Sequence, residues 1–147
     1  KEAADIIYQY FDKYPKIKQY MENQKAFAQQ HGYVETLLKR RRYIRDIHSK
    51  NSIVRGFAER NAINAPIQGS AADMIKLAMI KIHNEIEKRN LRSFITMQVH
   101  DELVLDVYKP ELEEVKAIVY DGMINAMPIT VPLEIDIKSG DNWLEAH

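Results

Sequence analysis

The 147-residue sequence contains no cysteine, which excludes disulfide bonds and cysteine-based metal sites and is typical of a reducing compartment. No apolar run is long enough to cross a membrane, and the charged first residues lack the layout of a signal peptide. Glycine is scarce, with five residues, and neither a glycine-rich phosphate loop nor a nucleophile elbow is present. An initiator methionine is also missing, so we expect the chain to be a piece of a longer protein. What the sequence does have, an apolar fraction of 46%, suffices for one ordinary core.

Charge is balanced over the whole chain but is unevenly distributed along it. Residues 39–60 carry eight Lys or Arg and two Asp or Glu, a net charge of +6, whereas residues 101–147 carry eleven Asp or Glu and three Lys, a net charge of −8. A basic segment combined with an acidic one suggests a polyanion site beside a metal site. On charge alone, a solvated charged surface is the simpler interpretation.

Hydrophobic spacing predicts an α+β fold in which helices precede an antiparallel sheet. We expect helices over residues 2–14, 15–32, 52–65 and 67–90 and another from Pro110, with Pro66 interrupting the long helical stretch. Ser70 and Asp73 have the spacing of a helix cap. Expected strands are residues 33–38, the two apolar runs of a hairpin at 93–99 and 103–107, and an alternating strand at 129–138, with Trp143 as a core anchor after it.

The stretch QVHDELVL, residues 98–105, places polar groups between the two apolar runs of the predicted hairpin. His100, Asp101 and Glu102 occupy the turn, although hairpin turns normally use Gly, Asn or Pro. Two adjacent carboxylates repel each other, and a divalent cation such as Mg²⁺ relieves that repulsion. Strain at a turn is often retained for a functional site. A merely polar, exposed turn is the competing interpretation.

Two further groups of residues have the chemistry for nucleic-acid contact. Arg60, Asn64 and Gln68 are spaced four apart and belong to the residue types that bind phosphates, sugars and base edges. Arg40, Arg41 and Arg42 form a basic run that could contact a phosphate backbone. Taken singly, each group is also consistent with an ordinary polar surface.

Together these segments resemble family A DNA polymerases of the bacterial DNA polymerase I type. VHDE with its apolar flanks is similar to the third palm motif of that family, and ERNAINAPIQGSAADMIK is similar to the helix before it. GYVETLLKRRRYIRD and VPLEIDIKSGDNWLEAH are similar to the flanking segments, so the resemblance extends along essentially the whole chain. Lys39 stands where many members have glycine, and Arg45 where many have proline.

The resemblance implies that the chain is the C-terminal part of a polymerase domain, with residues 1–90 a mainly helical fingers and palm segment and residues 91–147 the palm hairpin, a helix and a final strand. The implied reaction is nucleotide addition to a primer 3′-hydroxyl with two Mg²⁺ ions. Asp101 would bind metal, Glu102 would assist it, and His100 would lie near the primer terminus. Arg60, Asn64 and Gln68 would contact primer and template, and Arg40, Arg41 and Arg42 nucleic acid or the triphosphate.

Implied partners are primer-template DNA, deoxynucleoside triphosphates and the upstream remainder of the polymerase, with no membrane. The resemblance implies an intracellular location, in the bacterial cytoplasm with the nucleoid or encoded by a phage. The first palm motif, which carries the other metal-binding aspartate, is absent from this sequence, so we expect these residues alone to be inactive. Two other functions stay open: a nucleic-acid-binding module without catalysis, and a metal-dependent nuclease using Asp101 and Glu102.

Overall fold

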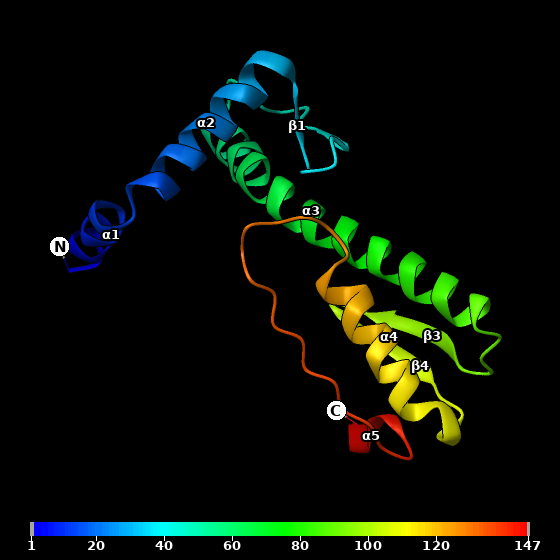
Figure 1. Cartoon of the computed structure of the whole chain (residues 1–147). Coiled ribbons are helices and arrows are strands. Elements are labelled where there is room, and N and C mark those ends of the chain that lie inside the picture. The colour runs from blue at the N-terminus through cyan, green and yellow to red at the C-terminus, as the bar shows by residue number, and fades with distance from the viewer. Residues whose placement is uncertain (1, 147) are drawn as a thin grey trace. The chain divides into compact units, whose positions relative to one another are not determined.

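The computed structural model describes residues 2–146 and is mainly helical, with two small antiparallel sheets (Figure 1). The helices are α1 (Glu2–Lys13), α2 (Pro15–His31), α3 (Ser52–Lys88), α4 (Leu112–Ile124) and α5 (Trp143–Ala146), with a short 3-10 helix η1 (Lys109–Glu111). The strands are β1 (Tyr33–Glu35), β2 (Arg41–Tyr43), β3 (Phe94–Val99) and β4 (Glu102–Asp106). The expected α+β fold is therefore confirmed. In the described part of the chain, no helix has the length and apolarity needed to cross a membrane.

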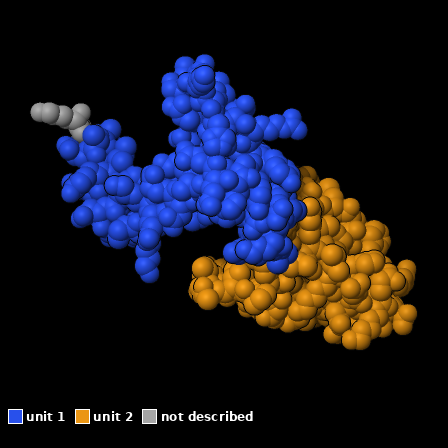
Figure 2. All heavy atoms as spheres, turned by 90° about the horizontal axis from the view of Figure 1, so that it is seen from above, with its two compact units in different colours: residues 1–70 blue, residues 71–147 orange. Residues whose placement is uncertain are grey.

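The chain forms two compact units, residues 1–70 and residues 71–147, which we call unit 1 and unit 2 (Figure 2). The core of unit 1 lies where α2, the β1–β2 hairpin and the first half of α3 meet. It is formed by small and β-branched side chains: Ala28, Val34, Ile44, Ile47, Ala58, Ala62 and Ala65. Gly32 ends α2 in the left-handed conformation, with a φ of 76°, as its position after the helix predicts.

Helix α3 is continuous over 37 residues, and the expected interruption at Pro66 is wrong. Proline inside a helix removes one hydrogen bond and costs about 3 kcal/mol. Ala58, Ala62 and Ala65 are buried in the two turns of the helix that precede the proline, so tertiary packing offsets the cost. One turn before the proline, the Tyr20 hydroxyl of α2 donates a hydrogen bond to the Ile63 carbonyl at 3.0 Å.

Ser70 and Asp73 consequently lie inside α3 and do not begin a helix, so the expected cap is also wrong. Both side chains are buried, with exposed fractions of 8% and 6%. The Ser70 hydroxyl donates a hydrogen bond to the Pro66 carbonyl at 2.6 Å. The hydroxyl therefore bonds back to the preceding turn of α3 and does not cap a helix start.

Unit 2 is built around the predicted hairpin, which the structure confirms as β3 and β4. The strands pair in antiparallel register from Phe94 opposite Asp106 to Val99 opposite Glu102, with an irregularity between Ile95 and Met97. The core comprises Ile82 and Ile86 of α3 and Val115, Ile118 and Val119 of α4, with hairpin side chains packed against it. Because Gly122 of α4 has no Cβ, Ile82 can pack directly against its backbone.

Residues 129–138 do not form the expected strand. The burial pattern alternates as predicted from Leu133 onward, and Ile137 packs against the core of unit 2. A strand also needs a partner edge, and within the described residues the only sheets are β1–β2 and β3–β4. Trp143, expected in the core, is 48% exposed at the start of α5. Alternation therefore identified the inward-facing residues from Leu133 onward, but it was wrong for Val131, which is 66% exposed, and wrong about a strand.

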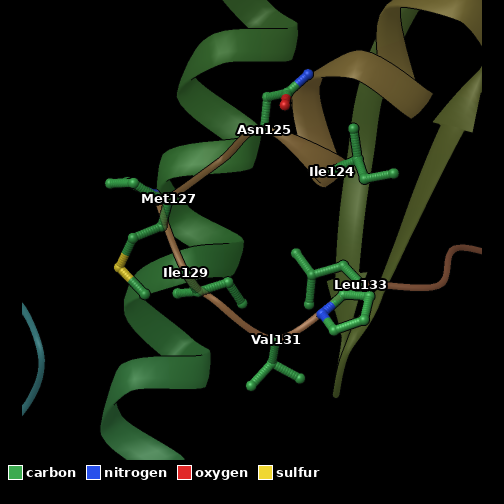
Figure 3. A pocket seen from close by; sticks show the side chains of 8 residues that line it. Ile124, Asn125, Met127, Ile129, Val131 and Leu133 are labelled. Carbon is green, nitrogen blue, oxygen red and sulfur yellow. The ribbon is translucent and has the colours of Figure 1, made fainter.

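An open pocket lies where this extended segment follows α4 (Figure 3). Its lining residues are Ile124, Asn125, Met127, Pro128, Ile129, Val131, Pro132 and Leu133. None of these side chains is titratable, and most are apolar. The pocket therefore lacks the groups needed for acid–base or metal chemistry, which have to be sought elsewhere.

Candidate nucleic-acid and metal site

The β3–β4 hairpin presents its three ionisable residues at the tip. Val99 pairs with Glu102, so His100 and Asp101 form a two-residue turn. His100 has a φ of 55°, at a turn position that favours glycine. The Gln98 side-chain amide donates to the His100 carbonyl at 2.8 Å and helps to hold the turn. The turn thus lacks Gly, Asn and Pro, and His100 adopts a backbone conformation that residues with a side chain seldom adopt.

Asp101 and Glu102 are consecutive and both exposed. Asp101 lies in the turn and Glu102 begins β4. Carboxylate oxygens are the ligands that Mg²⁺ prefers. Among the described residues, however, no three His, Cys, Asp or Glu side chains come together in a metal-binding group. The donor set at the hairpin fits a hard cation in chemistry but provides only part of a coordination sphere.

On α3, Arg60, Asn64 and Gln68 are all exposed. Because the helix continues through Pro66, their spacing of four residues keeps them on one side of it. The buried residues Ala58 and Ala62 lie on another side. Because α3 does not break at Pro66, Arg60, Asn64 and Gln68 form one continuous polar surface on unit 1, which we call the α3 stripe.

The three arginines lie in the β1–β2 hairpin of unit 1. Glu35 pairs with Arg41 and Val34 with Arg42, while Arg40 belongs to the connecting turn. Lys39, in the same turn, has a φ of 66°. The expected strand over residues 33–38 is therefore shorter, because the chain turns after Glu35.

Polar contacts distinguish the three arginines. Arg40 donates from a terminal guanidinium nitrogen to the Gly69 carbonyl at 3.0 Å. Arg41 donates from Nε to a Glu35 carboxylate oxygen at 3.1 Å, and this hydrogen bond raises the pKa of the Arg41 guanidinium. Arg42 is exposed at its position opposite Val34. The arginine run is therefore not one uniform basic patch.

The structure brings the arginine run and the α3 stripe into unit 1 and places His100, Asp101 and Glu102 in unit 2. Sequence reasoning missed Gly69 and Ser70, which dock the β1–β2 turn onto α3. The Ser70 hydroxyl accepts a hydrogen bond from the Leu37 backbone N–H at 2.9 Å. Two small residues directly after Gln68 are the only local signal that could have indicated this contact.

Comparison with known proteins settles the family. The profile described as DNA polymerase family A matches residues 1–145. This chain belongs to DNA polymerase family A. DNA polymerase I of Caldicellulosiruptor bescii is 51% identical over 145 residues, and that of Bacillus caldotenax is 49% identical over 146 residues. Each match covers 99% of this chain and 17% of the relative, so the chain spans about a sixth of the family A relatives it matches.

A solved family A structure gives the same result for the fold. It is described as the POL domain of Pol1 from M. smegmatis in complex with DNA primer-template and dNTP. It matches with a TM-score of 0.95 and 45% identity, covering 99% of this chain and 26% of that chain. The resemblance inferred from the motifs is thereby confirmed.

Proposed function

We propose that this chain is the C-terminal part of the polymerase domain of a DNA-directed DNA polymerase. The full-length protein would add deoxynucleotides to a primer 3′-hydroxyl, with the base sequence of the template selecting each nucleotide. Family membership over residues 1–145 supports the polymerase assignment. The solved relative described as holding primer-template DNA and dNTP supports these as the binding partners.

The observation that carries the proposal is the β3–β4 tip, where two carboxylates are held by paired strands. A side chain on a strand end is positioned more precisely than one on a long loop. We assign Asp101 as a metal-binding carboxylate and Glu102 as its neighbour, assisting directly or through water. His100 is assigned to the region of the primer terminus. These roles extend the family resemblance to individual residues of this chain.

Asp101 and Glu102 would hold Mg²⁺, which polarises phosphoryl oxygens and neutralises the charge that develops during transfer. Two carboxylates leave most of a two-ion site to be supplied by other protein groups, by water and by the substrate phosphates. The other protein groups that complete the metal site would come from the part of the full-length protein outside this chain. The role of the hairpin is to present its oxygens already oriented, with little reorganisation needed when the substrate binds.

In unit 1, Arg60, Asn64 and Gln68 are assigned to primer and template contact. Asparagine and glutamine can hydrogen-bond to base edges and sugars, and arginine to phosphates. All three are exposed on one stretch of α3. The stripe would follow the nucleic acid along the helix, while the adjacent hairpin adds positive charge.

The deciding experiment is primer extension by the full-length protein with Mg²⁺ and four dNTPs, comparing the native protein with its Asp101→Asn variant. We expect extension to fall by about 10³-fold or more, because removing an electrostatic catalytic group costs several kcal/mol. Binding of primer-template, measured in parallel, should persist.

Asp106→Asn is the matched control, since Asp106 is an exposed carboxylate at the other end of β4. It should extend primers normally. If Asp101→Asn extends primers as well as Asp106→Asn does, the hairpin is structural and the catalytic assignment is wrong.

A further inference from the structure

The β1–β2 turn is fastened to α3 by contacts that form a small docking site. The Leu37 N–H donates to the Ser70 hydroxyl, and the Arg40 guanidinium donates to the Gly69 carbonyl. Within the turn, the Arg40 N–H donates to the Thr36 hydroxyl oxygen at 3.2 Å. Backbone, hydroxyl and guanidinium groups thus meet at one point of the helix.

Gly69 allows this close approach. A Cβ at position 69 would lie 2.6 Å from the Thr36 methyl group and 3.4 Å from an Arg40 nitrogen. Carbon atoms normally approach to about 3.5–4.0 Å, so any side chain there would displace the turn. The guanidinium of Arg40 therefore lies against helix backbone as part of the docking contact.

Arg41 is engaged differently, on the face of the hairpin that also carries Tyr33 and Glu35. Its guanidinium lies 4.5 Å from the centre of the Tyr33 ring and is hydrogen-bonded to the Glu35 carboxylate. Lys39 is 3.6 Å from the other oxygen of the same carboxylate. Because Glu35 already offsets its charge, Arg41 adds little net positive potential for an external anion.

Arg42 lies on the opposite face from Arg41, because successive side chains of a strand alternate. Its side chain is exposed, and within the described residues no hydrogen bond or ion pair holds it. Arg40 uses a guanidinium donor on the Gly69 carbonyl and Arg41 is paired with Glu35, whereas the donors of Arg42 are available. An available guanidinium is well suited to the oxygens of a phosphate.

We infer that the three arginines divide their roles: Arg42 contacts a phosphate of the DNA backbone, whereas Arg40 and Arg41 are positioning residues that hold the hairpin. Gly69 and Ser70 complete the positioning set by receiving the turn on α3. The inference rests on the proposed function and refines it, since all three arginines were assigned to nucleic-acid or triphosphate contact together.

The test measures primer-template binding by the full-length protein as a function of salt concentration, together with thermal unfolding. Each phosphate contact on duplex DNA contributes about 0.9 to the slope of log K against log salt. Arg42→Gln should lower the magnitude of that slope by about 0.9 and leave the unfolding midpoint unchanged. Arg41→Gln, a matched removal of the same charge one residue away, should leave the slope nearly unchanged.

Arg40→Gln and Ser70→Ala should show the opposite pattern, with a lower unfolding midpoint. Their effects on that midpoint should not add in the double variant, because the two residues share one docking contact. An unchanged slope in Arg42→Gln, or equal slope losses in Arg41→Gln and Arg42→Gln, would overturn the division of roles. So would an Arg42→Gln variant whose only defect is a raised KM for dNTP. A full-length protein that binds no primer-template at all would instead refute the proposed function.

Discussion

At the scale of single residues, each of the two hairpin turns places a side chain in a backbone conformation that favours glycine. Lys39 and His100 have φ values of 66° and 55°, and each lies in the turn of a hairpin. A non-glycine residue in this region costs roughly 1–2 kcal/mol. At His100 the side chain belongs to the candidate site, which gives a reason to retain the strain. At Lys39, the one polar contact of the side chain among the described residues is a long ion pair with Glu35, in which the Lys39 side chain is 80% exposed.

Lys39→Gly should therefore stabilise the protein. Relief of backbone strain by roughly 1–2 kcal/mol outweighs the added flexibility of glycine in the unfolded chain, about 0.5–1 kcal/mol. Loss of an exposed ion pair costs little. Urea unfolding should show a net gain of about 0.5–1 kcal/mol. Lys39→Ala removes the same side chain but keeps the strain, and equal gains in both variants would contradict this explanation.

At the scale of elements, Glu111 joins the start of β3 to the start of α4. Its carboxylate accepts hydrogen bonds from the Ser93 hydroxyl at 2.6 Å and from the backbone N–H groups of Arg92 and Ser93. The Ser93 hydroxyl in turn accepts from the Tyr108 N–H at 3.0 Å. These hydrogen bonds, led by the one from the Ser93 hydroxyl, hold the pKa of Glu111 below its ordinary value of 4.5.

Stability should depend on pH through this group. A carboxyl whose pKa is lower in the folded state contributes stability above its ordinary value, and this contribution is lost as pH falls through the folded-state value. Glu111→Gln should thus be less stable than the native protein at pH 7, and the difference should shrink below about pH 4.5. Denaturant unfolding at several pH values measures this. Glu134→Gln, at an exposed carboxylate, controls for loss of charge, and a difference that is independent of pH would contradict the assignment.

Sequence reasoning succeeded where a local pattern decides the structure and failed where a distant contact does. Two apolar runs around a polar tip were enough to predict the β3–β4 hairpin and the position of Asp101 and Glu102 at its tip. The rule that proline ends a helix was overridden at Pro66 by the buried alanines in the preceding turns of α3. Alternation at residues 129–138 predicted burial from Leu133 onward but not at Val131, and it cannot reveal whether a neighbouring strand exists. The contact of Gly69 with Thr36 joins residues far apart in sequence, so no local pattern shows it.

At the scale of the whole molecule, the described chain exposes many large apolar side chains. Among the most exposed are Ile53 at 80%, Leu144 at 88% and Tyr8 at 73%. Scattered exposed apolar residues are ordinary, but extensive apolar surface usually marks a face that contacts another part of a protein. The chain spans about 17% of its closely similar relatives, so the remaining polypeptide of the full-length protein can cover such faces.

The isolated chain should accordingly fail to extend primers. Among the described residues no group of three metal-binding side chains is present, and we expect the other metal ligands to be supplied by the rest of the full-length protein. Primer extension with Mg²⁺ and dNTPs should be undetectable for the 147-residue chain under conditions in which the full-length protein is active. Circular dichroism of the same sample establishes whether it is folded. Measurable extension by the isolated chain would show that the catalytic groups are all within it.

The glycine at position 69 also determines how this region can change by mutation. A single-base change in a glycine codon that replaces the residue always introduces a side chain, and every such side chain begins with a Cβ. At Gly69 that atom meets Thr36, whereas at Gly56 the nearest atom is the end of a flexible arginine side chain at 3.8 Å. Random mutagenesis should therefore recover many replacements at position 56 and few at position 69, and survivors at 69 should carry a second change at Thr36.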